Sequence, residues 1–197
     1  MSEEAVLLDR AIHEEVALVP FDGQWACAFA AEHERLLHLF PHRLLQVEHV
    51  GSTAVPGMPA KPIIDILAGV QSMAVAEALV QPLLDSGYVT SSEFNATLKN
   101  RRWLMRAANG RRTHHLHLVV HGSSQWLDRL VFRDMLRCDA GLARRYADLK
   151  SGLVARHKQD REAYTDAKSV FVSSVLGAHN PVIERTHQTD QSALRLS

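Results

Sequence analysis

The segment 50–66 constrains the fold of this chain more than any other part of its sequence. It predicts a strand that ends in a Gly51–Ser52 turn, followed by a short loop rich in proline and glycine. A buried strand over 62–70 comes next and carries one carboxylate, Asp65, thirteen residues after Ser52. Backbone N–H groups in such a turn can hold phosphate oxygens, and a carboxylate at this spacing can hold a divalent metal. The pattern is typical of nucleotidyl-transfer sites of the polymerase-beta type.

Hydrophobic periodicity predicts both helices and strands in the rest of the chain. Helices are expected at about 25–40, 72–86, 125–138, 140–157 and 160–178, and strands at 44–50, 62–70, 101–107 and 113–120. The last two strands flank Asn109-Gly110, the strongest hairpin signal in the chain, and 88–90 is expected to form a short edge strand. Together these elements predict an α+β fold, a mixed sheet with flanking helices and a helical C-terminal segment.

The length of 197 residues suits one well-packed domain, which we place at 1–178. Within it, about 1–19 form a weakly specified lead-in and about 125–178 form the helical C-terminal part. Residues 179–197 are polar and lack periodicity, so this tail is expected to be disordered.

The charge balance argues against two classes of partner. Lys and Arg together number 22, as do Asp and Glu, so no net charge favours long nucleic acid or an acidic membrane. A nucleotide or another phosphorylated small molecule is therefore the expected partner. The acidic N-terminus has no apolar signal core and no apolar run could span a bilayer, so we expect no membrane partner and a cytoplasmic location. Cys27 and Cys138 lack metal-ligand spacing and are expected to be small apolar residues in helices.

Alternation along two of the predicted strands places three candidate ligands on one face of the sheet. The apolar side of these strands consists of Ile64, Ile66, Ala68, Leu116, Leu118 and Val120. If helices pack on that side, Asp65, His115 and His117 share the opposite one. An acid in an apolar strand is costly unless it is paired, hydrogen-bonded or metal-bound, so these three residues are the expected metal ligands. The alternatives are a carboxylate that accepts hydrogen bonds from the turn, and two hydrogen-bonded surface histidines.

Several basic residues are candidates for neutralising phosphate. Lys61 ends the loop that faces the Gly51–Ser52 turn, while Lys150 and Lys168 each follow a tyrosine by four positions on a predicted helix. These two lysines either line an anion pocket or are solvated on amphipathic helices. The basic residues expected to be exposed are His114, His121, Arg111 and Arg112. The spacing of glycine and lysine does not fit a P-loop, which disfavours kinase-type phosphate binding.

A series of short motifs runs in order along about residues 19–178. They are Phe21-Asp22-x-x-Trp25, Val47 to Gly57, Ala60 to Ile66, His115 to Leu118, Phe132 to Arg137, Tyr146-x-x-Leu149-Lys150 and Tyr164-x-x-x-Lys168. In these motifs the chain resembles the GrpB-like family of small bacterial proteins in the nucleotidyltransferase superfamily. The resemblance implies a nucleotidyltransferase-like fold with Gly51 and Ser52 as the phosphate-binding turn and Asp65 as the first metal carboxylate. Family members also occur fused to dephospho-coenzyme A kinase, which implies a functional link to coenzyme A synthesis.

One departure from the superfamily pattern concerns the metal. A second acid usually lies two positions after the first, and a third on a neighbouring strand, but here the second position is Leu67. His115 and His117 take the place of the neighbouring acid. One carboxylate and two imidazoles suit a single transition-type ion better than two Mg²⁺ ions, so the expected cofactor is a divalent metal, either Mg²⁺, Mn²⁺ or a transition ion.

The leading hypothesis is a nucleotidyltransferase that moves a nucleoside monophosphate from a nucleoside triphosphate to a small-molecule acceptor, with metal assistance. Its phosphate-binding residues would be Gly51, Ser52, Thr53, Lys61, Arg133, Lys150 and Lys168. Asp65 would hold the metal, and His117 or His115 would be a ligand or the catalytic base that deprotonates the acceptor. Two alternatives stay open: a non-catalytic module that binds a nucleotide or a coenzyme A precursor, and a metal-dependent phosphoester hydrolase.

Overall fold

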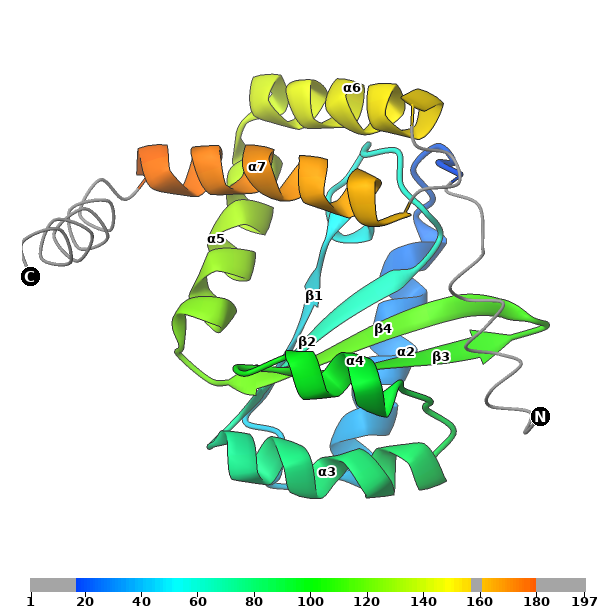
Figure 1. Cartoon of the computed structure of the whole chain (residues 1–197). Helices are drawn as coiled ribbons and strands as arrows, with labels where there is room; N and C mark the ends of the chain where they lie inside the picture. Colours follow the sequence, from blue (N-terminus) through cyan, green and yellow to red (C-terminus); the bar gives the residue numbers. More distant parts are fainter. Residues whose placement is uncertain (1–16, 157–160, 180–197) are drawn as a thin grey trace, which may run out of the picture.

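A computed structural model describes residues 17–156 and 161–179 of the chain (Figure 1). Most of the predicted lead-in at 1–19, and all but the first residue of the disordered tail predicted at 179–197, lie outside these residues. That first residue, His179, is the last residue of a helix. Within the described ranges, no helix combines the length and the apolar character that crossing a lipid bilayer requires.

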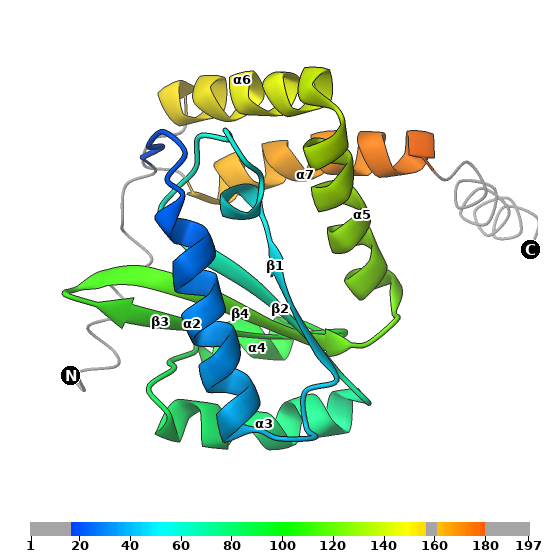
Figure 2. The same cartoon turned by 180° about the vertical axis from the view of Figure 1, so that it is seen from behind.

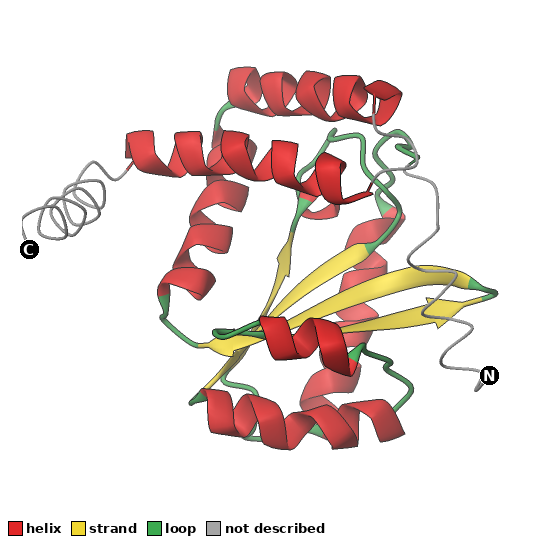
Figure 3. Ribbon diagram, in the orientation of Figure 1, coloured by secondary structure: helices red, strands yellow, loops and turns green. Residues whose placement is uncertain are grey.

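The strands form one mixed sheet (Figure 3). They are β1 (Gln46–Val50), β2 (Ile64–Val70), β3 (Arg102–Ala108) and β4 (Arg111–Val120), in the order β1-β2-β4-β3. β2 runs antiparallel to β1 and parallel to β4, and β3 and β4 form the predicted antiparallel hairpin. The prediction of an α+β fold with a mixed sheet is therefore confirmed.

The helices that flank the sheet are α2 (Gln24–Leu39), α3 (Met73–Asp85), α4 (Ser92–Thr97), α5 (Ser124–Cys138), α6 (Ala140–Arg156) and α7 (Arg161–His179), with a short 3-10 turn, η1, at Ser52–Ala54. The predicted helices are confirmed, and α4 was not predicted. Its N-cap is Ser91, whose hydroxyl oxygen accepts a hydrogen bond from the backbone N–H of Phe94. The edge strand expected at 88–90 is reduced to an isolated bridge between Val89 and Met105.

The apolar face of the sheet packs against α2 and α3, and Figure 2 shows α2 lying across that face. This core contains Ile64, Ile66, Ala68, Leu116 and Leu118, as alternation predicted, together with Leu36 and Leu79 from the helices. On the opposite face, Val50, Leu67 and Val119 pack against Trp126 of α5. Burial of these side chains is the main force that holds α2, α3 and α5 on the sheet.

The C-terminal helices form a second apolar cluster over the loop between β1 and β2. Val55 and Met58 of that loop are buried against Leu136 of α5 and Tyr146 of α6. The Tyr146 ring also stacks on Phe171 of α7, with ring centroids 5.4 Å apart. α6 and α7 therefore lie over the end of the sheet where the Gly51–Ser52 turn emerges (Figure 1).

Cys27 and Cys138 lie in helices, as predicted, and both are exposed. Two predictions about exposure were wrong. Arg112 is buried, since a register shift opposite Arg106 and Ala107 pairs it with Ala107 inside the sheet instead of at the hairpin tip. His114 is half-buried because it faces α2, whereas Arg111 and His121 are exposed, as predicted.

Candidate functional site

Asp65 of β2 and His115 of β4 form a direct pair across two parallel strands. They are register partners, and His115 Nδ1 lies 3.0 Å from Asp65 Oδ1. Burial alone would raise the pKa of Asp65, but the hydrogen bond and electrostatic interaction with His115, together with the charge of Lys168, lower it below its usual range. An ionised carboxylate has no proton to donate, so Nδ1–H of His115 is the donor in this bond.

Gly51 follows β1, where Val50 is the register partner of Asp65. Its φ of +73° lies in the left-handed region, and an added Cβ would lie only 2.3 Å from Asp65 Oδ2. The position therefore requires glycine for two reasons, conformation and space. Asp65 keeps 31% of its side-chain surface accessible, so the carboxylate touches the turn and remains open to a small ligand.

His117 lies two positions further along β4, opposite Leu67 of β2 and Trp103 of β3. Burial and the charges of Arg129 and Arg101 hold the pKa of His117 well below its ordinary value, although Asp65 acts in the opposite direction. His117 is therefore neutral at physiological pH. Its Nδ1 is buried and has no hydrogen-bond partner among the described residues.

The three expected metal ligands share a face, but only Asp65 and His115 are in direct contact. In the described ranges, no group of three His, Cys, Asp or Glu side chains is arranged to hold a metal ion. His115 is hydrogen-bonded to Asp65 through Nδ1, and Leu67 is fully buried where a second carboxylate would be needed. This donor set does not fit a two-metal site, which clamps the reacting oxygens between ions held mostly by carboxylates.

Lys150 of α6 reaches the Gly51–Ser52 turn from the C-terminal helices. Its Nζ donates to Ser52 Oγ at 2.9 Å and to the backbone carbonyl of Pro59 at 2.6 Å. The residue is 1% exposed, and burial together with the charge of Lys168 lowers its pKa to about 7. Lys150 is thus not a solvated helix lysine: it is a buried amine held against the turn.

Thr53 is engaged in a separate chain of hydrogen bonds. Its hydroxyl donates to the carbonyl of Ile63 at 3.2 Å, and its Oγ1 lies 3.0 Å from His49 Nε2. Because Thr53 has a single hydroxyl proton, His49 must be the donor, in its Nε2–H form. Burial lowers the pKa of His49 to about 4, which agrees with a neutral ring. Thr53 thereby ties the turn to the start of β2.

The other predicted phosphate ligands lie in different settings. Arg133 is buried on α5 and donates to Glu48, to Asp134 and to the carbonyl of His49, so its guanidinium anchors α5 to β1. Lys168 of α7 is close enough to influence the pKa of both Asp65 and Lys150. Lys61 is half-buried at the end of the loop that leads into β2.

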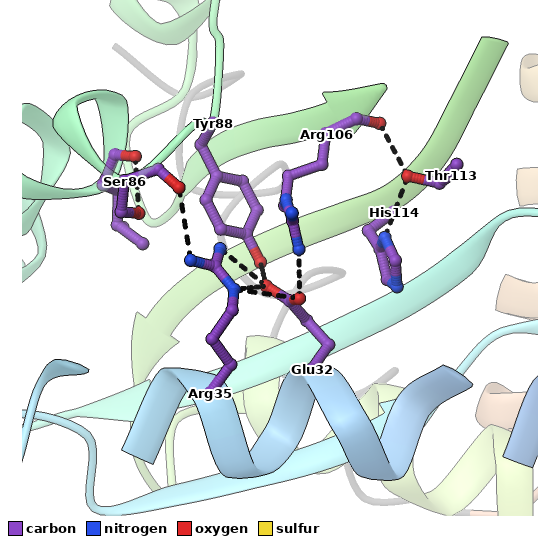
Figure 4. Close-up of polar contacts among 8 residues, drawn as sticks. Glu32, Arg35, Ser86, Tyr88, Arg106, Thr113 and His114 are labelled. Atoms are coloured by element: carbon purple, nitrogen blue, oxygen red, sulfur yellow. Dashed lines mark hydrogen bonds and ion pairs between the residues drawn. The ribbon is translucent and has the colours of Figure 1, made fainter. Parts of the chain in front are cut away.

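Two interactions were not predicted from the sequence, one at the Gly51–Ser52 turn and one on the far face of the sheet. Arg137 of α5 donates from Nε to the carbonyl of Ala54, 2.9 Å away, and so helps to hold the turn. On the far face of the sheet, Glu32 of α2 is buried and accepts hydrogen bonds from Arg35, Tyr88 and Arg106 (Figure 4). The only sequence signal for this network was the spacing of Glu32 and Arg35 by three on one helix.

The comparisons with known proteins agree with one another. A family model described as GrpB protein matches residues 15–178. The crystal structure of the conserved protein GrpB from Enterococcus faecalis is 31% identical, with a TM-score of 0.71, and the match covers 81% of this chain and 94% of that one.

Two curated relatives are longer than this chain. The UPF0157 protein YqkA of Bacillus subtilis is 32% identical over 160 residues, which are 81% of this chain and 46% of that protein. A protein named dephospho-CoA kinase from Mycolicibacterium paratuberculosis is 33% identical over 175 residues, covering 78% of this chain and 43% of the relative. The chain thus spans less than half the length of each of these two relatives.

Proposed function

This chain belongs to the GrpB family, and we propose that it binds a nucleotide at the Gly51–Ser52 turn and transfers the nucleoside monophosphate to a small-molecule acceptor. We likewise propose that its mixed sheet is a variant of the nucleotidyltransferase fold, because a strand, a Gly-Ser turn and a strand with an inward carboxylate occur in the order that fold uses. The proposal rests on one observation. Asp65 touches the Cα side of Gly51 and is paired with His115, and Lys150 contacts Ser52 on the same turn.

The phosphate chain would lie at this turn. Backbone N–H groups at a glycine with positive φ can form an anion-binding concavity, and Lys150 and Lys168 supply positive charge beside it. An oxyanion close to Lys150 would favour its ammonium form, which strengthens the contact. The same charge would stabilise the pyrophosphate that leaves.

The catalytic base would be His115. Because Asp65 holds Nδ1–H, Nε2 is the ring atom that would take the proton of the acceptor, and since Nε2 is buried, neighbouring side chains would have to shift to admit the acceptor. The acceptor oxygen or nitrogen then forms a bond to the α-phosphorus, the bond from that phosphorus to the bridging oxygen breaks, and pyrophosphate departs. Asp65 stabilises the imidazolium that results. The resemblance implies a divalent ion, whereas the described side chains do not form a ligand set for two ions. The test below is therefore run both with and without metal.

A second candidate is a binding module without turnover. The observation that favours it is Leu67, which is fully buried where a nucleotidyltransferase places another metal carboxylate. The similarity to a protein named dephospho-CoA kinase suggests coenzyme A precursors as ligands for either candidate.

The test measures binding and turnover separately. Nucleoside triphosphates and coenzyme A precursors are screened by thermal shift, with and without Mg²⁺ or Mn²⁺, and pyrophosphate release is then followed with candidate acceptors. We expect nucleotide-dependent stabilisation of the wild type and a loss of turnover of about 10²–10⁴-fold in His115→Gln, since a general base contributes about this much. Asp65→Asn should lose turnover as well, and Asp85→Asn, which changes an exposed carboxylate, is the matched control.

Each result has a definite meaning. Stabilisation without any turnover would favour the binding module, and phosphate release from a phosphoester without an acceptor would favour a hydrolase. If no nucleotide stabilises the wild type with or without metal, the proposed function is wrong.

A further inference from the structure

Two arginines lie on the same side of the sheet as Asp65 and His117, between α4 and α5. Arg101 directly precedes β3, and alternation places it on the side of Trp103, the register partner of His117. Arg129 lies on α5 and donates from one Nη to the carbonyl and the side-chain oxygen of Gln125, at 2.7 and 2.8 Å. The two guanidiniums are close enough to each other for Arg101 to lower the pKa of Arg129.

A hollow of about 390 Å³ opens at this place. Its lining consists of Thr97, Leu98, Lys99, Asn100, Arg101 and Gln125. Trp103 of β3 follows Arg101 by two positions, and its ring centroid lies 5.5 Å from that of Phe94 on α4 and 5.4 Å from that of His115. Arg101 and Trp103 thus connect the hollow to the face of the sheet that carries the Asp65–His115 pair.

Arg101 lines the hollow directly, and Arg129 is linked to its edge by the hydrogen bond to the Gln125 side chain. In the part of the chain that the structure describes, neither Arg101 nor Arg129 forms an ion pair with a carboxylate. Arg102, by contrast, points to the other side and pairs with Glu77 of α3. Both Arg101 and Arg129 are half-buried, and burial lowers the pKa of each, that of Arg129 to about 10. Asp128 and Asp65 act on Arg129 in the opposite direction, but burial and the charge of Arg101 outweigh them. An oxyanion between the two guanidiniums would offset the cost of desolvating them.

We propose that Arg101 and Arg129 form a second anion subsite, which binds an oxyanion group, a phosphate or a carboxylate, carried by the acceptor substrate. The assignment to the acceptor rests on the proposed function, in which the donor phosphates occupy the Gly51–Ser52 turn. An anionic group held in the hollow would position the remainder of the acceptor over the sheet face beside His115. Guanidinium groups suit this role because each can donate two parallel hydrogen bonds to one oxyanion.

The test is a titration of the full chain with inorganic phosphate, and separately with succinate, followed by backbone amide NMR. Amides of 99–101 and Gln125 report on the hollow, and those of 51–53 report on the turn. In the wild type we expect the hollow amides to shift with at least one of the two probes, and the stronger probe identifies the oxyanion. Arg101→Gln and Arg129→Gln should each weaken this binding by about tenfold or more, as expected when a charge-assisted hydrogen bond is lost.

The controls separate this proposal from a general charge effect and from the proposed function. Arg111→Gln removes the same charge at the exposed hairpin tip and should leave both sets of amides unchanged. Arg101→Lys keeps the charge and should retain part of the binding, which shows that loss in Arg101→Gln is not a failure to fold. If no nucleotide stabilises the wild type but the hollow amides still respond to phosphate or succinate, the nucleotide proposal fails and the subsite stands. If the hollow amides of the wild type do not shift, or shift equally in both glutamine variants, the subsite is overturned.

Discussion

Lys150 and Ser52 are 98 positions apart in the sequence, yet the Nζ of Lys150 lies 2.9 Å from the Ser52 hydroxyl oxygen. A second hydrogen bond, to the carbonyl of Pro59, attaches the same amine to the far end of the loop. The C-terminal helices thus hold the turn through one buried side chain. Whether the Lys150 amine is protonated depends on pH, and it determines the charge that the turn presents to a ligand.

The first prediction concerns proton uptake. At pH 8 Lys150 is mostly neutral in the free protein, because burial and the charge of Lys168 lower its pKa to about 7. An oxyanion bound at the turn would favour the ammonium, so binding of pyrophosphate should take up as much as about one proton. Calorimetry in two buffers of different ionisation enthalpy measures this number. Lys150→Met should abolish the uptake, and an unchanged uptake in that variant would contradict the assignment.

The same residue predicts how stability depends on pH. The folded pKa of about 7 lies below the ordinary value of 10.5, so between these values the unfolded chain binds a proton that the folded chain lacks. The free energy of unfolding should therefore gain a contribution that grows as the pH rises from 7 towards 10.5. Chemical denaturation at several pH values measures the slope. It should be flatter for Lys150→Met, and equal slopes would show that the amine titrates normally.

Two glycines with almost the same backbone conformation allow the cost of backbone strain to be measured apart from the cost of a steric clash. Gly51 and Gly57 have φ of +73° and +74°, but only at Gly51 would a Cβ meet Asp65. Gly57→Ala should cost about 1 kcal/mol of unfolding free energy, the strain of a left-handed residue. Gly51→Ala should cost about 2–4 kcal/mol, because the clash with the carboxylate is added. Urea denaturation of both variants measures the difference, and equal losses would mean that Asp65 moves aside freely.

His49 predicts a loss of stability in mild acid. Burial lowers its pKa to about 4, whereas the unfolded residue takes up a proton near pH 6.5. Stability should therefore fall as the pH drops from 6.5 to 4, by no more than about 3 kcal/mol from this residue. His49→Gln keeps a donor for Thr53 and should reduce the slope in this interval. A wild-type slope in the variant would assign the acid sensitivity to other histidines.

The Glu32 network predicts a purely structural effect. Glu32→Gln removes the charge that Arg35 and Arg106 share, on the face of the sheet opposite to Asp65 (Figure 4). We expect a loss of about 2–4 kcal/mol in unfolding free energy, moderated by solvent because the arginine side chains are 29% and 31% exposed. Thermal denaturation measures the loss. Phosphate binding at the turn should be unchanged below the melting temperature, and a change there would show that the two faces are coupled.

Much of the fold could be predicted because the strand and helix periods of this sequence are regular. Alternation assigned Ile64, Ile66 and Leu116 to the helix-covered face, and it put Asp65 and His115 together on the other one. The bend at Gly51 could also be expected, since a Gly-Ser pair between a strand and a Pro/Gly loop indicates a turn. These features depend on neighbours that are close in sequence or on one strand pairing.

The rest depends on how distant elements pack, which a periodic pattern does not encode. The helical spacing of Lys150 is the same for a solvated and for a buried lysine, and only the docking of α6 on the turn decides between them. Arg133 could not be distinguished from a phosphate ligand until Glu48 was seen beside it. The sequence did not predict that Arg101 and Arg129 lie near each other, because α4, which borders the hollow, has only six residues and a weak sequence signal.

The parallel pairing of β2 with β4 determines at which stage of folding the site can form. Asp65 and His115 meet only after the 50-residue crossover between them has been completed, so no contiguous fragment ending before β4 can contain the pair. Such non-local pairing belongs to the late, cooperative part of folding. Amide hydrogen exchange in the central strands and ligand binding at the pair should consequently report on the same event, the opening of the whole sheet.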